Sequence, residues 1–317
     1  MINILCIGEA LIDMICTDKD VSLSNGENFL KKPGGAPTNV AAAISALGGE
    51  AYLSAKVGKD PFGDHLVAVM KAFNVRTDFI IQDANYFTTF AFVSLLANGE
   101  RDFYFNRGAD AQLSKEDISK IDLQQFPIVH FGSATGFLPG PLQETYDYLF
   151  EQALANNCFI SFDPNYRQLL FQNDQAFFIK KSWQYIEACN FFKVSDEEAL
   201  LITGEKNIED AASMFSKKSK AIFAITIGKE GTLLGIKGQT FKVESLPVDP
   251  VDTTGAGDAF VGAVLYLLSL KTPQELAAIT NEEWQTIIVQ SNKAGARTCE
   301  YLGAMEAFKH LNKNIFN

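Results

Sequence analysis

Compact apolar runs alternate with helix-like stretches from about residue 120 onward, and this alternation constrains the fold more than any other feature. The strand-like runs are Ile128 to Phe131, Cys158 to Phe162, Phe191 to Val194 and Ala221 to Ile227. The helix-like stretches are Pro141 to Asn156, Asp174 to Cys189 and Ile208 to Lys217. Runs that are apolar throughout are typical of parallel strands buried on both faces. The pattern therefore predicts an α/β fold with a large, doubly wound, mostly parallel sheet flanked by helices.

Two stretches, Ile12 to Phe29 and Phe87 to Phe105, depart from this rhythm. They carry β-branched and aromatic residues at mixed spacing, with turn signals at Ser24-Asn25-Gly26 and Ala97-Asn98-Gly99. The second signal predicts a hairpin between Thr88–Leu95 and Arg101–Phe105. We expect a small β-sheet lid built from segments at about 12–34 and 86–110, although an extension of the main sheet is the alternative. The sequence shows no repeat or linker, so residues 1–317 are predicted to form a single unit.

The charge balance excludes several classes of partner. The 317 residues include 27 Lys and Arg against 38 Asp and Glu, which gives a net charge of −11 and no basic run. An extended nucleic-acid surface or an anionic-membrane footprint is therefore not expected. The longest apolar run, Ala259 to Leu270, is shorter than the roughly 20 residues that a membrane-spanning helix needs. The segment Met1 to Gly8 has no basic leader and is interpreted as a first strand, so we expect a soluble cytoplasmic protein.

Several common chemistries find no matching residues. The three histidines, His65, His130 and His310, have no His or Cys partner at metal-ligand spacing. The sequence contains no GxSxG nucleophile elbow, no GxxxxGK[ST] phosphate loop and no GxGxxG dinucleotide fingerprint. The five cysteines are far apart, with no CxxC pair, and are predicted to be buried, reduced thiols.

The segment from Asp252 to Ala263, DTTGAGDAFVGA, carries the clearest chemical signal. Asp and Thr are good N-cap residues, and small residues here open a strongly apolar helix. At such a start the amides of Gly255, Ala256 and Gly257 have no intrahelical partner, and with the helix dipole they form an anion cradle. Asp258 follows in the first turn. A carboxylate repels a phosphate, so its place beside the cradle is explained if it accepts the proton of a hydroxyl that attacks the phosphoryl group. The structural alternative is that Asp258 only stabilises the helix start.

A second glycine cluster precedes an Ala-rich helix predicted from Val40 to Leu47. Gly34 and Gly35 permit a small polar ligand to approach the backbone, and Asn39 can donate and accept hydrogen bonds to hydroxyl groups. A plain turn followed by a helix-starting Asn is the structural alternative.

Both glycine clusters resemble signatures of the PfkB (ribokinase-like) carbohydrate kinases. The first runs from Gly34 to Ala41 and on to Gly48, Gly58, Asp60 and Gly63, and the second is Asp252 to Val264. The segments Gly8 to Asp13, Asp163 to Arg167, Thr226 to Gly231 and Asn292 to Ala296 agree with the same family, so the resemblance covers essentially the whole chain.

The resemblance implies ATP-dependent phosphorylation of a sugar hydroxyl with Mg²⁺, on a large α/β domain with a small β-sheet lid. It implies that Asp258 is the base and that Gly255, Ala256 and Gly257 stabilise the transferring phosphate. The sugar would contact Asp13, Gly34, Gly35, Asn39, Tyr104, Arg107, Asp163, Arg167 and Asp258. The nucleotide would border Lys193, Ser195, Thr226, Gly228, Gly231, Asn292 and the glycines of the cradle.

Metal sites are implied in the same way. The family's NxxE motif is Ser195-Asp196-Glu197-Glu198 here, so Glu198 would act on Mg²⁺ through water, while Ser195 replaces the Asn. The alternative for this run is an acidic helix start. The resemblance also raises a monovalent-cation site, such as K⁺, near Asp252 and Thr254.

The overall pattern is most similar to the fructokinase branch, which implies conversion of D-fructose to fructose 6-phosphate. The nearest rival is 2-keto-3-deoxygluconate kinase, whose lid usually carries an Arg in a Tyr-Tyr-Arg triplet. This chain has Phe103-Tyr104-Phe105, with Arg107 two residues later. Because Phe105 cannot pair with a carboxylate, the lid favours a neutral ketohexose.

Other interpretations stay open. Ribose or a nucleoside is an alternative substrate, and a non-catalytic sugar sensor on the same scaffold is an alternative function. An exposed edge strand of the lid would also favour a homodimer.

Overall fold

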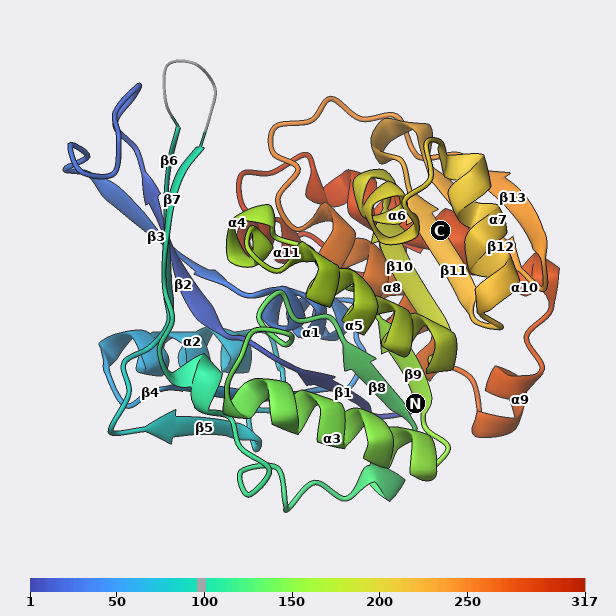
Figure 1. Ribbon diagram of the computed structural model, residues 1–317, viewed down its shortest axis with the longest axis horizontal. Coiled ribbons are helices and arrows are strands. Elements are labelled where there is room, and N and C mark those ends of the chain that lie inside the picture. Colours follow the sequence, from blue (N-terminus) through green and yellow to red (C-terminus); the bar gives the residue numbers. More distant parts are fainter. Residues whose placement is uncertain (96–100, 317) are drawn as a thin grey trace.

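Figure 1 shows the computed structural model, which describes residues 1–95 and 101–316. Within these ranges a nine-stranded sheet has the order β13-β12-β11-β10-β9-β8-β1-β4-β5. Its neighbours pair in parallel, except that β12 is antiparallel to both β11 and β13. The strands are β1 (Ile4–Ile7), β4 (Ala51–Gly58), β5 (Ile80–Asp83), β8 (Ile128–Phe131), β9 (Phe159–Phe162), β10 (Phe191–Ser195), β11 (Ile222–Thr226), β12 (Thr232–Ile236) and β13 (Gln239–Val243).

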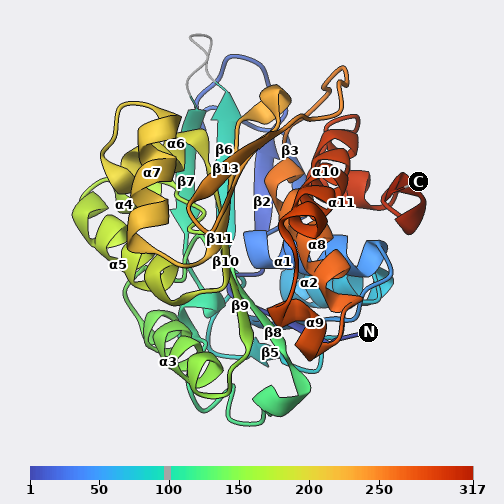
Figure 2. The same ribbon diagram turned by 90° about the vertical axis from the view of Figure 1, so that its right-hand side faces the viewer.

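Alternate side chains of the inner strands of this sheet enter two different cores. In β1, Ile4 and Cys6 belong to one buried cluster, and Leu5 and Ile7 belong to the other. Figure 2 shows helices on both faces of the sheet. One face carries α1 (Ala36–Ala46), α2 (Pro61–Ala72), α8 (Ala256–Ser269), α9 (Pro273–Ala277), α10 (Asn281–Thr298) and α11 (Ala304–Phe308). The other face carries α3 (Pro141–Ala155), α4 (Gln168–Phe171), α5 (Gln175–Ala188), α6 (Asp196–Thr203) and α7 (Ile208–Lys218). The predicted doubly wound α/β fold is confirmed.

Four strands form a separate, smaller sheet in the order β3-β2-β6-β7. These are β2 (Leu11–Cys16), β3 (Phe29–Gly34), β6 (Phe90–Leu95) and β7 (Arg101–Asn106), and the sheet stands away from the large one at the left of Figure 1. The two departing stretches of the sequence therefore pair with each other instead of extending the large sheet. The hairpin turn predicted at Ala97-Asn98-Gly99 lies outside the described residues.

Two helix starts differ from the sequence-based expectation. The helix predicted from Val40 begins at Ala36, because Pro37 occupies a first-turn position where its missing N–H is not needed. At α8, Asp and Thr were predicted as caps, but the N-cap is Gly255, whose φ of 81° is left-handed. Only glycine adopts that conformation at little cost, so the glycine itself makes the tight entry into the helix.

The arrangement of strands indicates where a ligand site should lie. Strand β1 has β4 on one side and β8 on the other, so the winding of the chain reverses there. In open α/β sheets, clefts for ligands form outside the carboxyl ends of the strands at such a reversal.

All five cysteines are free. None of the helices in the described ranges combines the length and apolar character that a bilayer crossing requires.

Candidate active site

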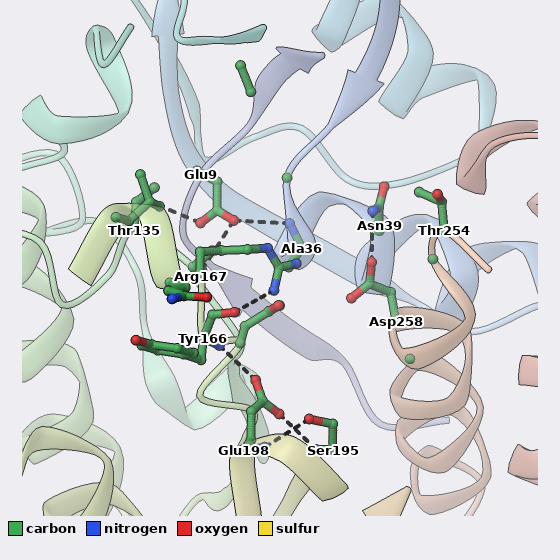
Figure 3. A pocket seen from close by; sticks show the side chains of 18 of the residues that line it. Glu9, Ala36, Asn39, Thr135, Tyr166, Arg167, Ser195, Glu198, Thr254 and Asp258 are labelled. Atoms are coloured by element: carbon green, nitrogen blue, oxygen red, sulfur yellow. Dashed lines mark hydrogen bonds between the residues drawn. The ribbon is translucent and has the colours of Figure 1, made fainter. Parts of the chain in front are cut away.

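A cleft of about 800 Å³ lies between the carboxyl ends of the large sheet and the inner face of the small sheet. The small sheet contributes Leu11, Asp13, Ala91, Phe103 and Phe105 to its wall. The large domain contributes Glu9, Asn39, Arg167, Lys193, Glu198, Gly255, Gly257 and Asp258, together with neighbouring residues of the same loops. Figure 3 shows several of these side chains converging from elements that are far apart in the sequence.

The start of α8 presents free backbone donors to the cleft. Both Gly255 and Gly257 line it, and their amide nitrogens have no hydrogen-bond partner in the part of the chain that the structure describes. The expectation for Ala256 needs correction, because its amide donates to the carbonyl of Thr253 at 3.2 Å. The turn that brings the chain into the helix uses this donor. The cradle therefore rests on Gly255 and Gly257, with the positive end of the helix dipole behind them.

Asp258 lies in the first turn of the same helix. Its Oδ2 accepts a hydrogen bond from Nδ2 of Asn39 in α1 at 2.8 Å, and Figure 3 shows the pair at the edge of the cleft. Burial raises the pKa of Asp258, while the Asn39 bond and the charges of Arg167 and Lys193 oppose the rise. Asn39 lines the cleft, where its contact with the sugar stays a prediction, and its amide group also donates to the candidate base. The Oδ1 of Asn39 is buried without a partner in the described ranges.

Asp13 projects from β2 into the cleft. An added Cβ at Gly34 would lie 2.1 Å from Oδ2 of Asp13, so a larger residue at position 34 would require this carboxylate to move. Burial raises the pKa of Asp13 to about 6, Arg167 opposes the rise, and Glu9 adds to it. Gly35 follows as the N-cap of α1 with a φ of 104°. The structure thus brings Asp13, Gly35 and Arg167 to the wall of the cleft, whereas Gly34 lies next to Asp13 and does not line it.

The buried carboxylate of Glu9 is a functional candidate that the sequence-based list did not include. Its Oε1 accepts from the amides of Ala36 at 3.0 Å and Ala134 at 3.3 Å, and its Oε2 accepts from the hydroxyls of Ser133 and Thr135. Figure 3 shows Glu9 between these segments. Glu9, in the connection between β1 and β2, therefore binds both the start of α1 and the loop that follows β8. Glu9 follows the apolar run Ile4–Ile7 after a single glycine, Gly8, and a carboxylate so close to the end of a buried strand is a signal that could have identified it.

Lys193 and Asp163 form a buried ion pair next to the cradle. Nζ of Lys193 lies 3.2 Å from Oδ2 of Asp163. Burial lowers the pKa of Lys193, but nearby carboxylates, first Asp163, outweigh this effect and raise it. Lys193 lines the cleft as expected, whereas Asp163 does not. Asp163 is buried and paired with Lys193, and its expected contact with the sugar stays a prediction.

The Ser195–Glu198 segment forms a capping box at the start of α6. Oγ of Ser195 accepts from the amide of Glu198 at 3.1 Å, and Oε2 of Glu198 accepts from the amide of Ser195 at 2.8 Å. Oε1 of Glu198 accepts from the amide of Tyr166 at 2.7 Å (Figure 3). The structural interpretation of this acidic run therefore holds, and both residues still line the cleft. No group of three or more metal-ligating side chains gathers anywhere in residues 1–95 and 101–316.

Two lid residues lie outside the cleft, contrary to expectation. Tyr104 is 59% exposed, because side chains alternate along β7 and the cleft receives Phe103 and Phe105. Arg107 is committed to internal bonds: its nitrogens donate to Asp110, to the carbonyl of Pro139 at 2.8 Å and to that of Thr135 at 3.3 Å. The guanidinium therefore fixes the end of the small sheet against the loop that carries Thr135.

The predicted nucleotide residues beyond β10 do not line this cleft. Thr226 lies beside Ser195 in the strand register, so it extends the same row of strand ends. Gly228 and Gly231 have φ values of 52° and 97° in the turn between β11 and β12. Asn292 uses its side chain internally, accepting from Thr232 at 2.7 Å and donating to two carbonyls at the end of β13.

The loop before α8 holds the proposed cation residues. Oδ1 of Asp252 accepts from the amide of Thr254 at 3.0 Å and from its hydroxyl at 2.7 Å, and Oδ2 accepts from the amide of Gly303 at 2.8 Å. The carboxylate of Asp252 thus fastens the cradle loop to the start of α11.

Comparison with known proteins gives a consistent result. The family "pfkB family carbohydrate kinase" matches residues 1–310. The chain is 34% identical over 308 residues to probable fructokinase-2 of Arabidopsis thaliana, covering 96% of this chain and 92% of the relative. Among solved structures, fructokinase with bound ATP from Xylella fastidiosa superposes with a TM-score of 0.86 at 26% identity, covering 99% of this chain and 96% of the other. A fructokinase double mutant from Vibrio cholerae O395 with bound fructose, ADP and potassium ion gives a TM-score of 0.83 at 26% identity, with 100% and 97% coverage.

Proposed function

Since this chain belongs to the pfkB family of carbohydrate kinases, we propose that it transfers the terminal phosphate of ATP to D-fructose and forms fructose 6-phosphate. One observation carries the proposal: the half-buried Asp258 carboxylate lies in the same first helical turn as the free amides of Gly255 and Gly257. A base and an anion cradle at one helix start are the two groups that phosphoryl transfer to an alcohol requires.

The chemistry assigns one role to each group. Asp258 accepts the proton of the sugar hydroxyl while the hydroxyl oxygen bonds to the terminal phosphorus of ATP. The bond between that phosphorus and the bridging oxygen breaks, and ADP leaves. The amides of Gly255 and Gly257 donate to the oxygens of the transferring group, and Lys193 adds a positive charge beside them. The raised pKa of Asp258 makes its carboxylate a better proton acceptor than an ordinary aspartate.

The residues of this cleft fit Mg²⁺ through a water-mediated contact with one carboxylate, that of Glu198. The two oxygens of Glu198 each accept a backbone amide, and each retains a lone pair for a water molecule. Protein-bound Mg²⁺ commonly keeps several waters and binds through few carboxylates and the phosphates of its substrate. We therefore assign Glu198 to a water-mediated contact. When bound, the ion would neutralise charge on the phosphates.

The sugar end of the cleft favours a neutral substrate over a sugar acid. Arg167 acts on both Asp13 and Asp258, and Lys193 also acts on Asp258. Because Lys193 is paired with Asp163, the carboxylates here still exceed the cationic charge. Phe103 and Phe105 cover this end from the lid, and the nitrogens of Arg107 are committed elsewhere. A keto-acid carboxylate would therefore meet excess negative charge. These contacts support fructose over 2-keto-3-deoxygluconate.

A coupled assay that measures ADP tests the proposal. Purified protein with ATP and Mg²⁺ should turn over fructose with a higher kcat/KM than ribose, a nucleoside or 2-keto-3-deoxygluconate. A higher kcat/KM for the keto acid would dismiss fructose, and sugar binding without ATP consumption would favour the sensor. Replacing Asp258 with Asn should lower kcat by about 10²–10⁴-fold and leave ATP binding intact. Retained turnover in this variant would refute the mechanism.

We infer further that the small sheet acts as a lid over the sugar and that Thr226, Gly228, Gly231 and Asn292 shape the nucleotide end. Monovalent-cation binding near Asp252 and Thr254 is tested by repeating the assay with and without K⁺.

The inner face of the lid also carries Ile15 and Leu30, which are 40% and 41% exposed. This apolar surface supports a homodimer, and sedimentation of a monomer at working concentration would exclude it.

A further inference from the structure

The ends of strands β9 and β10 place Asp163 beside Lys193. Phe162 pairs with Phe192 in the register, so the next residue of each strand lies in the same row at the carboxyl edge of the sheet. The ion pair of 3.2 Å has exposed side-chain fractions of 10% for Lys193 and 3% for Asp163. The other oxygen of Asp163 accepts from the amide of Asn165 at 3.1 Å. Asp163 is therefore a fixed anchor with no contact to the cleft.

Lys193 reaches from this anchor to the cradle. A Cβ added at Gly257 would lie 3.3 Å from Nζ of Lys193, so the ammonium group lies beside one of the two free amides. A lysine side chain has a flexible four-carbon stem and carries a point charge, so its direction depends on a partner. Glu198 and Asp258 also attract this ammonium, but neither forms a direct ion pair with it in the described ranges.

A buried ion pair is a costly way to stabilise a fold. Taking both charges out of water offsets most of their attraction, and apolar residues of similar volume are often equally stabilising. The neighbouring row one residue earlier, Phe162 and Phe192, shows that the sheet accommodates apolar pairs here. The charged pair at the edge of the cleft thus calls for a role beyond packing.

We propose that Asp163 is a positioning residue that acts through Lys193: it holds the ammonium at the mouth of the cradle, where Lys193 contacts the terminal phosphate of ATP. This inference rests on the proposed function. It replaces the role that the family resemblance implied for Asp163, which was contact with the sugar. The two roles differ in which ligand loses affinity when Asp163 is changed.

A double-mutant cycle separates the two roles. We would measure Kd for a non-hydrolysable ATP analogue and for ADP by calorimetry, without sugar and with Mg²⁺, in wild type, Lys193→Met, Asp163→Asn and the double variant. Lys193→Met should weaken the analogue about 10- to 100-fold, the usual effect of losing a hydrogen bond from a charged group. ADP lacks the terminal phosphate and should bind nearly unchanged. Asp163→Asn should shift the ratio of the two Kd values in the same direction.

The double variant gives the decisive comparison. If Asp163 acts only through Lys193, the double variant binds both nucleotides and the sugar as Lys193→Met does. If Asp163 contacts the sugar, sugar affinity falls in Asp163→Asn and in the double variant but not in Lys193→Met, and the proposal is overturned. Should Asp163→Asn fail to fold, because it leaves a buried ammonium unpaired, the double variant removes both charges and the same comparison decides.

A matched control and the wild type complete the experiment. Asp117 forms a part-buried ion pair with Lys56 at 2.9 Å and does not line the cleft. Asp117→Asn should lower stability without changing the ratio of analogue to ADP affinity. If wild type binds neither nucleotide, the proposed function itself fails. If wild type prefers the analogue and the variants of Asp163 and Lys193 keep that preference, only the positioning role is refuted.

Discussion

Replacing Asp13 with asparagine should stabilise the free protein, although Asp13 is a proposed sugar-binding residue. The carboxylate of Asp13 projects into a cleft where burial raises its pKa to about 6, with Arg167 opposing and Glu9 adding to the rise. A raised pKa means that the folded protein binds a proton on this group more tightly than the unfolded chain does. The ionised form present at neutral pH is therefore destabilising, and a neutral amide of the same shape removes that cost.

The magnitude follows from the shift and has a definite pH window. The pKa rises from 3.8 to about 6, and each pH unit corresponds to about 1.36 kcal/mol, so ionised Asp13 costs roughly 3 kcal/mol at pH 7. The cost is absent below the unfolded pKa, grows as pH rises through the interval, and is complete above the folded pKa. For a chain of this size, roughly 3 kcal/mol corresponds to a rise in Tm of about 5 °C.

Urea unfolding of wild type and Asp13→Asn between pH 4 and pH 7.5 measures the difference directly. The gap in free energy of unfolding should grow from near zero at the acid end to about 3 kcal/mol at pH 7. Asp249→Asn, at an exposed aspartate, controls for the loss of one negative charge. Fructose should stabilise wild type and not Asp13→Asn. A gap that does not change with pH, or a variant less stable than wild type, would refute the reasoning.

Other substitutions test the cradle, the base of the lid and the candidate general base. Gly255→Ala should lower the free energy of unfolding by about 1–2 kcal/mol or more, because φ is 81° and its Cβ would lie 2.4 Å from that of Ala304; urea titration checks this. Arg107→Ala should raise the sugar KM more than it lowers kcat, because the small sheet loses its bonds to the cleft loop. Arg107→Lys should not restore it, since a compact ammonium cannot reproduce the planar fork whose three nitrogens reach separate acceptors. The acid limb of the kcat/KM profile should lie above pH 3.8, because the pKa of Asp258 is raised above that ordinary value. Lys193→Met removes a cation that opposes the rise, so the acid limb of this variant should lie at still higher pH; pH profiles of wild type and variant measure the difference.

The architecture of the large sheet was predictable because it is encoded locally. Uninterrupted apolar runs require a strand covered on both faces, and Ile128 to Phe131 forms such a strand within the predicted bounds. The order of the strands was not predictable, because it depends on which distant segments pair. The helix start at Ala36 was missed for a different reason: the helix was predicted only from its Ala-rich part, although a proline, here Pro37, is suited to the first helical turn.

The same distinction between local and distant contacts explains which parts of the candidate site the sequence could predict. Gly255, Gly257 and Asp258 lie within four consecutive residues, so the rules for helix starts predict that they share one helix start, but not that the entry turn uses the amide of Ala256 or that Gly255 is the N-cap. The bond from Asn39 to Asp258 and the ion pair of Lys193 with Asp163 join segments that only the folded sheet brings together. One structural rule recovers part of this information, since a charged residue at the carboxyl end of a buried parallel strand lies at the ligand edge. At the end of the first apolar run, the nearest charged residue is Glu9, so this rule would have selected it. Its carboxylate accepts the amides of Ala36 and Ala134 and so joins two segments around the cleft.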